Sequence, residues 1–488
     1  MTNPNTPVIV GVAQVLHRAG GTDDLIEPLD MMLEACLRAE QDTGARGLLE
    51  QVQSVRVIRG IWNYQNPAKY IAERIGATGA QTTGTLFGGN YVQYVVNHTA
   101  ESILNGDLDL VLLTGAENGN SAGKARKAGV KIDLTKTPGE YDVLLGDQKP
   151  EHHDDEIEKG IRTAIQVYPM YENAIRYHRG ESLEEHLLRV SELWARFNDV
   201  ACNNPNAWIQ ENLTAEEIRT PSAGNRRVSF PYTKFMNANM IVDMGAALIL
   251  CSVDKARKLG IPEHLWIYPH AGVEGNDHFS ASVRENFYSS PAIRLVGQRV
   301  MELAGTDVDE LSFVDLYSCF PSAVQIAAGE LGLNERDPLT VTGGLTFGGG
   351  PLNNYVMHSV SRMVELLRES PGKKGLITAN GGNLYKHAHC IYSSEPPAKD
   401  FRHDNVQAAI DALPSRDNIT GYEGEAEIES YTVMFDGDKP AIGHCACLTP
   451  GGERTWVNTD DPELMAAMTT EEFCGRPVTI KADTLHLR

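Results

Sequence analysis

The chain has 488 residues, of which 42% are hydrophobic and 22% are charged, so it is long enough to bury a large core without disulfide bonds. Its formal net charge of -22 argues against nucleic acid as a partner, because an acidic surface repels a phosphate backbone. The eight cysteines include no Cys-x-x-Cys pair, so no zinc ribbon or disulfide framework is predicted and a cytoplasmic location is expected.

The first apolar run, residues 8–15, contains Gly11 and Gln14 and has no basic segment before it. It therefore predicts a buried strand rather than a signal peptide. No stretch approaches the roughly 20 apolar residues that span a bilayer, so we expect no membrane insertion.

The first half of the sequence alternates between the periodicities of strands and helices. Two glycines and Asn90 precede one of these helices, and Gly106 stops it. Helices, strands and glycine turns in this order indicate a buried parallel sheet. The predicted elements are a strand at 7–15, a helix at 24–40, a strand at 54–58, a helix at 66–75, a helix beginning at Tyr91 and a strand at 108–115.

Residues 120–229 are charged and rich in histidine, with an amphipathic helix near 183–199, and are typical of an inserted loop or lid domain. Apolar sequence returns at 230–252. The second half, 253–395, repeats the theme of the first. Its predicted elements are a strand running into a helix at 311–320, a glycine loop at 343–351, a helix at 352–369 and a strand at 375–383.

The C-terminal part differs in pattern from the rest. Prolines and charges predict a linker at 396–420. Short alternating runs within 421–488, with one helix at 461–472, predict a separate small β-barrel that resembles an OB-fold.

Four motifs give the sequence a family resemblance. SILNGDLDLVLLTGAEN, VDLYSCF, GGLTFGGGP and TANGG occur in the order and at the spacing seen in the thiolase superfamily, and resemble sterol-carrier-protein thiolases and bacterial thiolase-like proteins of the acetyl-CoA acetyltransferase type. The resemblance covers about residues 7–395. It implies an α/β fold with αβαβα layers, built from two similar halves: 1–119 with 230–252, and 253–395. It also implies a homodimer that uses a coenzyme A thioester as substrate, with no permanently bound cofactor.

The thiolase resemblance also identifies what is missing. Thiolases place a nucleophilic cysteine at a helix N-terminus, a histidine in a Gly-His-Pro loop and a second cysteine in a Cys-x-Gly turn. The aligned positions here are Gly89, followed by Asn90; Gly349-Gly350-Pro351; and Asn380-Gly381-Gly382. Since no cysteine lies between residues 37 and 201, no shift of the alignment supplies a nucleophile, and we predict that no acyl-cysteine forms.

Three residues are candidate catalytic groups. Tyr317 stands where sterol-carrier thiolases place a histidine, and could act as a general acid or donate to an enolate. Asn380 could donate to a thioester oxygen or cap a turn. His387 could exchange a proton nearby, and is our candidate neighbour to favour the phenolate of Tyr317. Each could instead be structural.

Candidate substrate-binding residues surround these positions. They are Gly89 and Asn90 through free N–H groups at a helix start, Gly349 and Gly350 in the glycine loop, Tyr355 at the lip of the entrance, and Arg226 and Arg227 facing coenzyme A phosphates. Ordinary turns, core packing and surface charge are the alternatives. No metal site is predicted, because the His152–Asp155 run is more typical of a solvated loop.

The sequence leaves three functions open. The first is a thiolase-like enzyme that acts on a carbon–carbon bond beside an acyl-CoA thioester without an acyl-cysteine. The second is a retro-aldolase on β-hydroxyacyl-CoA, and the third is a non-catalytic protein that binds acyl-CoA.

Overall fold

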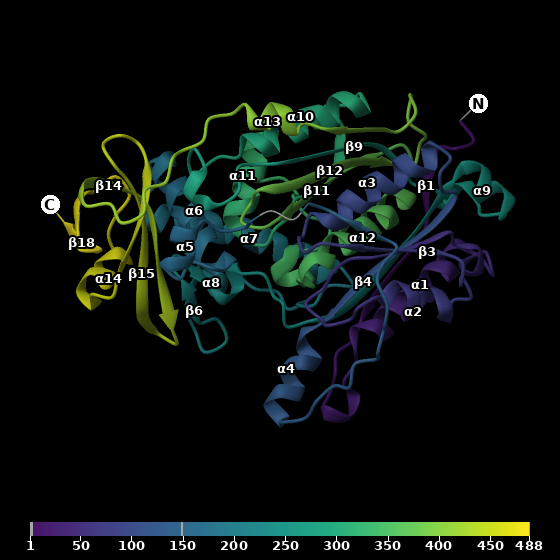
Figure 1. Ribbon diagram of the computed structural model, residues 1–488, viewed down its shortest axis with the longest axis horizontal. Helices are drawn as coiled ribbons and strands as arrows, with labels where there is room; N and C mark the ends of the chain where they lie inside the picture. The colour runs from purple at the N-terminus through teal and green to yellow at the C-terminus, as the bar shows by residue number, and fades with distance from the viewer. Residues whose placement is uncertain (1–2, 148–149, 488) are drawn as a thin grey trace.

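Two β-sheets separated and flanked by helices form the main body of the chain, and a third sheet forms a lobe at the C-terminus (Figure 1). The computed structural model describes residues 3–147 and 150–487. The five alternating layers are those that the thiolase resemblance predicts.

The first sheet has six strands and belongs to the N-terminal half. Across the sheet they are β1 (Pro7–Leu16), β8 (Asp243–Ser252), β4 (Leu110–Asn118), β2 (Ser54–Val57), β3 (Gln81–Thr85) and β5 (Val143–Leu145). The strands from β4 to β5 are parallel, as predicted, whereas β8 is antiparallel to both of its neighbours. The apolar pattern could not reveal this, because β8 is buried along its whole length.

The second sheet has five strands from the C-terminal half. They are β10 (Leu311–Asp315), β11 (Lys374–Gly381), β12 (Lys386–Ser393), β9 (Tyr268–Asn276) and β13 (Arg402–Asn405). Strand β13 lies inside the predicted linker, 396–420, and pairs in parallel with β9. The prediction of a linker is therefore wrong for these residues, whose sequence, RHDN, shows no apolar alternation.

Helices occupy the layers inside and outside the two sheets. The inner layer contains α3 (Tyr91–Leu104) and α12 (Tyr355–Glu369), each of which contacts strands of both sheets. The outer layers contain α1 (Pro28–Thr43) and α2 (Pro67–Arg74) on the first sheet, and α10 (Pro291–Ala304) on the second, with α11 (Pro321–Leu331) packed beside it. Helix α3 follows directly from the Gly88-Gly89-Asn90 turn, so the inner layer positions that turn between the two halves.

The inserted segment, predicted as a loop or lid domain, contains helices, one of which is buried in the body of the protein. It contains α4 (Gly119–Ala128), α5 (Asp154–Glu158), α6 (Ala164–Arg179), α7 (Leu183–Asn203) and α8 (Ala215–Arg219). Helix α6 is buried over most of its length and packs against α11 on one side and the C-terminal lobe on the other. It belongs to the interior, since its polar residues are used in buried hydrogen bonds.

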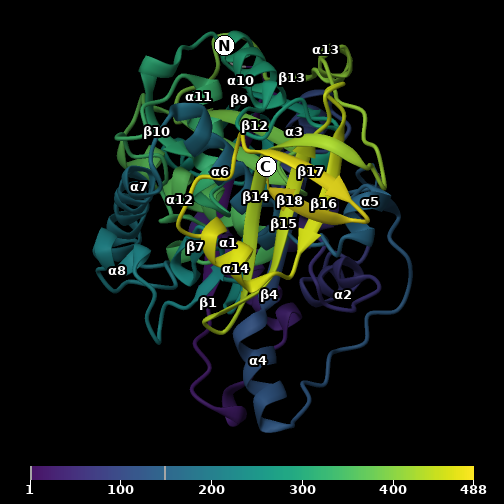
Figure 2. The same cartoon turned by 90° about the vertical axis from the view of Figure 1, so that its left-hand side faces the viewer.

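The C-terminal lobe is a twisted sheet (Figure 2), and buried apolar side chains give it a core of its own. Its strands are β16 (Arg454–Thr459), β15 (Lys439–Leu448), β14 (Gly424–Asp436), β17 (Pro477–Lys481) and β18 (Thr484–Leu487). The short strands β6 (Arg227–Ser229) and β7 (Tyr232–Thr233) extend it, and α14 (Pro462–Met468) packs on it. Residues of β16 and β18 contact each other, but no ladder joins them among the described strand pairs, so an OB-like barrel stays a prediction.

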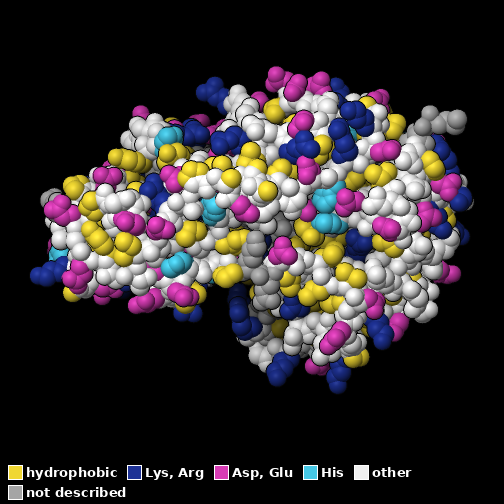
Figure 3. Space-filling model, turned by 45° about the horizontal axis from the view of Figure 1, so that its top comes forward, with side chains coloured by type: hydrophobic (Ala, Val, Ile, Leu, Met, Phe, Trp, Pro, Cys, Tyr) yellow, Lys and Arg dark blue, Asp and Glu magenta, His cyan; other side chains and the backbone are white. Residues whose placement is uncertain are grey.

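The molecular surface mixes charges of both signs. Figure 3 shows acidic, basic and apolar side chains interspersed over one face of the body and the lobe. Among the described residues, no helix combines the length and the apolar character needed to cross a membrane.

Candidate functional site

Gly89, at the position of the thiolase nucleophile, lies against Tyr317 and Asn380. A Cβ built on Gly89 would collide with the Tyr317 hydroxyl and the Asn380 carbonyl oxygen, and would lie 2.9 Å from Tyr317 Cζ. The three positions that the resemblance aligned with the thiolase motifs therefore lie together in the structure. It also follows that Tyr317 fills the space into which a cysteine side chain would project.

Tyr317 is held just beyond the end of β10. Its backbone N–H donates to Thr378 Oγ1 at 2.9 Å, and its ring packs edge-to-face on Tyr355 with centroids 5.5 Å apart. Burial, followed by the nearby Cys319 and Tyr355, raises the pKa of Tyr317 well above the ordinary value of 10. The hydroxyl is therefore a neutral hydrogen-bond donor at physiological pH, and not the phenolate that we expected His387 to favour.

Asn380 lies at the end of β11 and links the site to α6. Its Nδ2 donates to Tyr168 Oη at 2.9 Å, and the Tyr168 ring stacks on Phe320 with centroids 4.4 Å apart. Asn380 Oδ1 is buried and accepts no hydrogen bond from the described residues. Its side chain thus has one acceptor free.

Tyr168 is a site residue that the sequence did not reveal. It is 1% exposed, and burial raises the pKa of its hydroxyl well above 10. It lies in a segment whose charged composition predicted a lid, and no spacing relates it to the thiolase motifs. Only the docking of α6 brings it to Asn380.

His387 lies directly opposite Asn380 in the β11–β12 pair. Side chains at such opposed positions are neighbours on one face of a sheet. Burial, with a smaller contribution from Arg284, lowers the pKa of His387 to about 4, so the ring is neutral. Its Nε2 has no hydrogen-bond partner among the described residues, and none of the described contacts joins it to Tyr317. The expected pair of His387 and Tyr317 is replaced by a pair of His387 and Asn380.

Asn90 completes the group at the start of α3. It is 4% exposed, and its Oδ1 accepts no hydrogen bond in the described part of the chain. A Cβ on Gly381 would lie 2.5 Å from this oxygen and 3.2 Å from the Gly89 nitrogen. The glycine at position 381 therefore allows the turn after β11 to approach the start of α3 closely.

The glycine loop and the hydroxyl of Tyr355 are engaged in contacts outside the group around Gly89. A Cβ on Gly349 would meet Met244 and Trp208, and the Gly350 N–H donates to Asn239 O at 2.9 Å. Tyr355 is 1% exposed and donates to the carboxylate of Asp315 at 3.1 Å. The expectation that Tyr355 lines the lip of an entrance is wrong, because its hydroxyl belongs to a buried hydrogen-bond network.

Arg226 and Arg227 lie at the C-terminal lobe. Both are exposed, and the guanidinium group of Arg227 stacks on the ring of Phe435 at 5.5 Å. No described contact joins either arginine to Gly89, Tyr317 or Asn380. The structure thus separates them from the other candidates.

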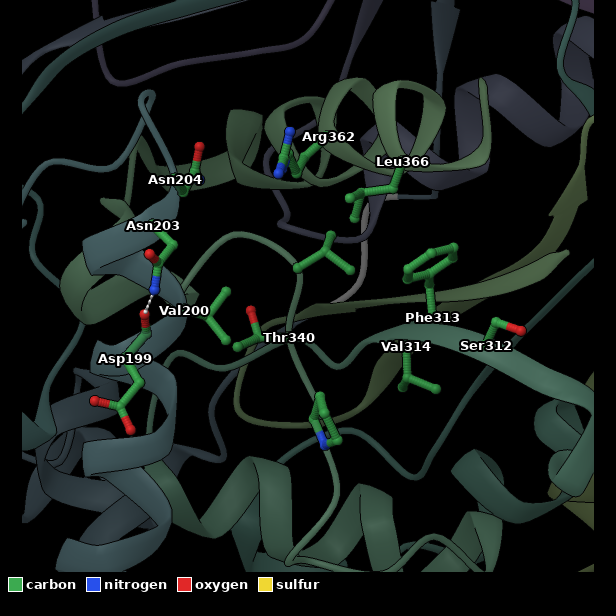
Figure 4. A pocket seen from close by; sticks show the side chains of 12 residues that line it. Asp199, Val200, Asn203, Asn204, Ser312, Phe313, Val314, Thr340, Arg362 and Leu366 are labelled. Atoms are coloured by element: carbon green, nitrogen blue, oxygen red, sulfur yellow. Dashed lines mark hydrogen bonds between the residues drawn. The ribbon is translucent and has the colours of Figure 1, made fainter. Parts of the chain in front are cut away.

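Two cavities each have a wall on the second sheet, and one of them is lined by residues that lie next to candidate site residues in the chain. A cavity of about 510 Å³ is lined by Thr85, Leu86 and Phe87, which lead into Gly88, and by Lys386, which precedes His387. A cavity of about 360 Å³, shown in Figure 4, lies between the end of α7, β10 and α12, and includes none of the predicted site residues.

Cys319 is the cysteine of the site, and it is not suited to be a nucleophile. It is 9% exposed, and burial raises the pKa of its thiol to about 12. A thiol with such a pKa is almost fully protonated at neutral pH.

Comparisons with known proteins bear on the family and the fold. Residues 405–484 match the family model of the thiolase-like protein type 1 additional C-terminal domain. Acetyl-CoA acetyltransferase IA of Candida tropicalis is 30% identical over 147 residues, which are 30% of this chain and 34% of that enzyme. The chain thus matches only about a third of that relative's length.

Two solved structures extend the likeness. The monomeric SCP2-thiolase like protein type 1 from Mycobacterium smegmatis is 30% identical, with a TM-score of 0.86 and 100% of both chains covered. The Ltp2-ChsH2(DUF35) aldolase is 19% identical, with a TM-score of 0.61 over 80% of this chain and 98% of that one, and shares the fold. This chain therefore belongs to the thiolase superfamily, among its SCP2-thiolase-like proteins with an additional C-terminal domain.

Proposed function

We propose that the protein acts on a carbon–carbon bond beside an acyl-CoA thioester without forming an acyl-cysteine. The observation that carries this proposal is the Tyr317 hydroxyl packed against Gly89, in the space that a nucleophilic side chain would need. Breaking or forming such a bond requires an enolate to be stabilised and a proton to be moved. The site offers groups for both tasks.

Tyr317 and the start of α3 are suited to stabilise an enolate oxygen. A buried neutral phenol can donate a hydrogen bond while it keeps its proton, so it need not ionise. The first N–H groups of a helix are free to donate as well, and the helix dipole favours negative charge there. We assign to Asn380 the role of orienting the thioester through its amide.

His387 favours the second candidate, a retro-aldolase. A neutral imidazole with a free Nε2 can accept the proton of a β-hydroxyl group. The Cα–Cβ bond then breaks, and the β-carbon becomes a carbonyl carbon. The electron pair of the broken bond forms the thioester enolate. The enolate carbon takes up a proton to release the shortened acyl-CoA, so the reaction needs no oxidant or metal ion.

The closed form of the site favours the third candidate, a protein that binds acyl-CoA without turnover. Tyr317 is 9% and Asn380 4% exposed, so a substrate must open the site. We propose that coenzyme A thioesters enter beside Phe87 and Lys386 and that they are substrates rather than permanently bound cofactors. We also propose that the protein works in the cytoplasm.

Steady-state kinetics on matched β-hydroxyacyl-CoA and β-ketoacyl-CoA substrates test these functions. With the better substrate, Tyr317→Phe should lower turnover at least about tenfold while acyl-CoA binding and the melting temperature stay near those of the wild type, because one hydrogen bond to the enolate is lost. Tyr288→Phe, at an exposed tyrosine stacked on His178, is the matched control.

The outcomes separate the three candidates. Turnover of the β-hydroxyacyl-CoA alone identifies the retro-aldolase, and binding of both thioesters without turnover identifies the binding protein. Wild-type turnover by Tyr317→Phe would show that Tyr317 belongs to the core and has no part in the reaction.

A further inference from the structure

Two histidines and a glutamate converge outside the candidate site, at the edge of the second sheet. His98 lies on α3, Glu274 on β9 and His403 on β13. One nitrogen of each histidine and one carboxylate oxygen all lie within 4.8 Å of one another. Three elements distant in sequence thus bring three potential metal ligands to one point.

Two side chains of this cluster are buried and already paired with each other. His403 Nε2 and Glu274 Oε2 form an ion pair at 3.1 Å, and the two side chains are 7% and 8% exposed. Imidazole and carboxylate groups that separate elements hold this close are arranged as metal ligands are. A metal ion would take the place of the proton that the two groups share, because metal ligands bind in their deprotonated form.

A neighbouring carboxylate orients one of the histidines. Glu101 Oε2 lies 3.1 Å from His403 Nδ1, on the side of the ring away from Glu274. A carboxylate that holds one ring nitrogen fixes the tautomer and leaves the other nitrogen free to bind a metal ion. His98 Nε2 approaches the second oxygen of Glu274 at 3.0 Å.

The spacing of these atoms is close to what a small tetrahedral ion needs. Zinc–nitrogen and zinc–oxygen bonds of about 2.0–2.1 Å at tetrahedral angles place ligand atoms roughly 3.3 Å apart. The separations of 3.0 and 3.1 Å run from the two imidazoles to different oxygens of Glu274. One ligand atom from each of the three residues lies within 4.8 Å of the other two, so the side chains need to move closer together to bind one ion. Imidazole and carboxylate ligands favour zinc over calcium or magnesium, which prefer all-oxygen sites.

We propose that His98, Glu274 and His403 bind one Zn²⁺ ion per chain, with solvent at the fourth position. His98 is 29% exposed, which gives the ion a path from solvent. The ion would join β13 to α3, the helix that follows the turn containing Gly89. Strand β13 also leads into the C-terminal domain, whose family match begins at residue 405. The site is therefore placed to fix the connection between body and lobe.

The test uses the full chain, stripped with a chelator and then titrated with Zn²⁺ by calorimetry, with metal content measured after desalting. We expect one zinc ion per chain and a higher melting temperature. Binding should be lost in His98→Ala and in His403→Ala, and Glu101→Gln should weaken it about 10–100-fold. His486→Ala, at an exposed histidine, is the matched control and should bind as the wild type does.

Co²⁺ titration of the wild type provides a readout that needs no variant. A visible spectrum typical of a four-coordinate nitrogen and oxygen site, displaced by Zn²⁺, would support the proposal. A thiolate band would assign the metal to cysteine and overturn it. The same conclusion would follow if the wild type bound no stoichiometric zinc, or if His98→Ala bound zinc unchanged.

Discussion

At the residue scale, position 89 is closed to any side chain. A Cβ there would collide with the hydroxyl of Tyr317 and the backbone oxygen of Asn380. We therefore expect Gly89→Cys to destabilise the protein by about 1–3 kcal/mol, as overpacked substitutions do, and to form no acyl-enzyme. Thermal unfolding and intact-mass analysis after incubation with acetyl-CoA measure both effects.

The control for this substitution is Gly123→Cys on α4. A Cβ at Gly123 meets no atom within 4 Å, so the new thiol should leave the melting temperature nearly unchanged. The opposite result is a Gly89→Cys variant that is stable and carries an acetyl group on the new thiol. It would mean that Tyr317 moves away readily and that the chain retains a latent thiolase site.

The sequence predicted which candidate residues lie together but not their electrostatics, and their roles in a reaction stay predictions. The motif order brought Gly89, Tyr317 and Asn380 together, as the structure does, because the thiolase fold places those three loops side by side. It paired Tyr317 with His387 wrongly, since strand register, which sequence spacing does not reveal, puts His387 opposite Asn380. The neutral state of both residues follows from burial, and burial depends on the whole fold.

At the element scale, strand β16 fastens the C-terminal lobe to the body through Arg454. This side chain is fully buried and pairs with Glu429 at 2.6 and 2.7 Å. Its Nη1 also donates to the carbonyl oxygens of Ala281, Ser282 and Arg284 at 2.9, 2.9 and 2.6 Å. The guanidinium group therefore replaces the water that these groups would otherwise bind.

Substitution of Arg454 by alanine should loosen this junction. The loss would leave Glu429 and three carbonyl groups unpaired, and removing one partner of a buried pair costs about 3–5 kcal/mol. Urea unfolding should show this loss, with faster hydrogen exchange at 281–284. Arg476→Ala, which breaks an exposed ion pair with Glu471, should cost less than about 1 kcal/mol. Equal effects of the two substitutions would exclude a special role for Arg454.

Elements with a regular apolar pattern were predictable, and polar buried elements were not. The amphipathic period gave α1 and α7 to within a few residues, and the apolar run gave β4. Strand β12, KHAHCIYS, escaped prediction because its histidines and lysine are buried by packing on β9 and β11. Helix α6 was assigned to a lid for the same reason, since its charged residues find partners only in the folded protein.

At the scale of the whole molecule, the arrangement of sheet edges bears on association. The thiolase resemblance implies a homodimer, whereas the relative matched along its full length is described as monomeric. Strand β5 of the same chain covers β3, so β3 is not open to a second copy. The edge strands β5, β10 and β13 have only 3, 5 and 4 residues. Short edges offer little template for a second copy.

We therefore expect a monomer. The other edge strand of the first sheet, β1, is largely buried and bridged at Ile9 to Ile267, and the net charge of -22 makes two copies repel each other. Light scattering during gel filtration should give a mass of 53.5 kDa at micromolar concentration. Runs at low and high salt form the control, because salt screens the repulsion but does not create an interface. Twice that mass at both salt concentrations would show that the homodimer implied by the thiolase resemblance forms, even though β5 covers β3 at the edge of the first sheet.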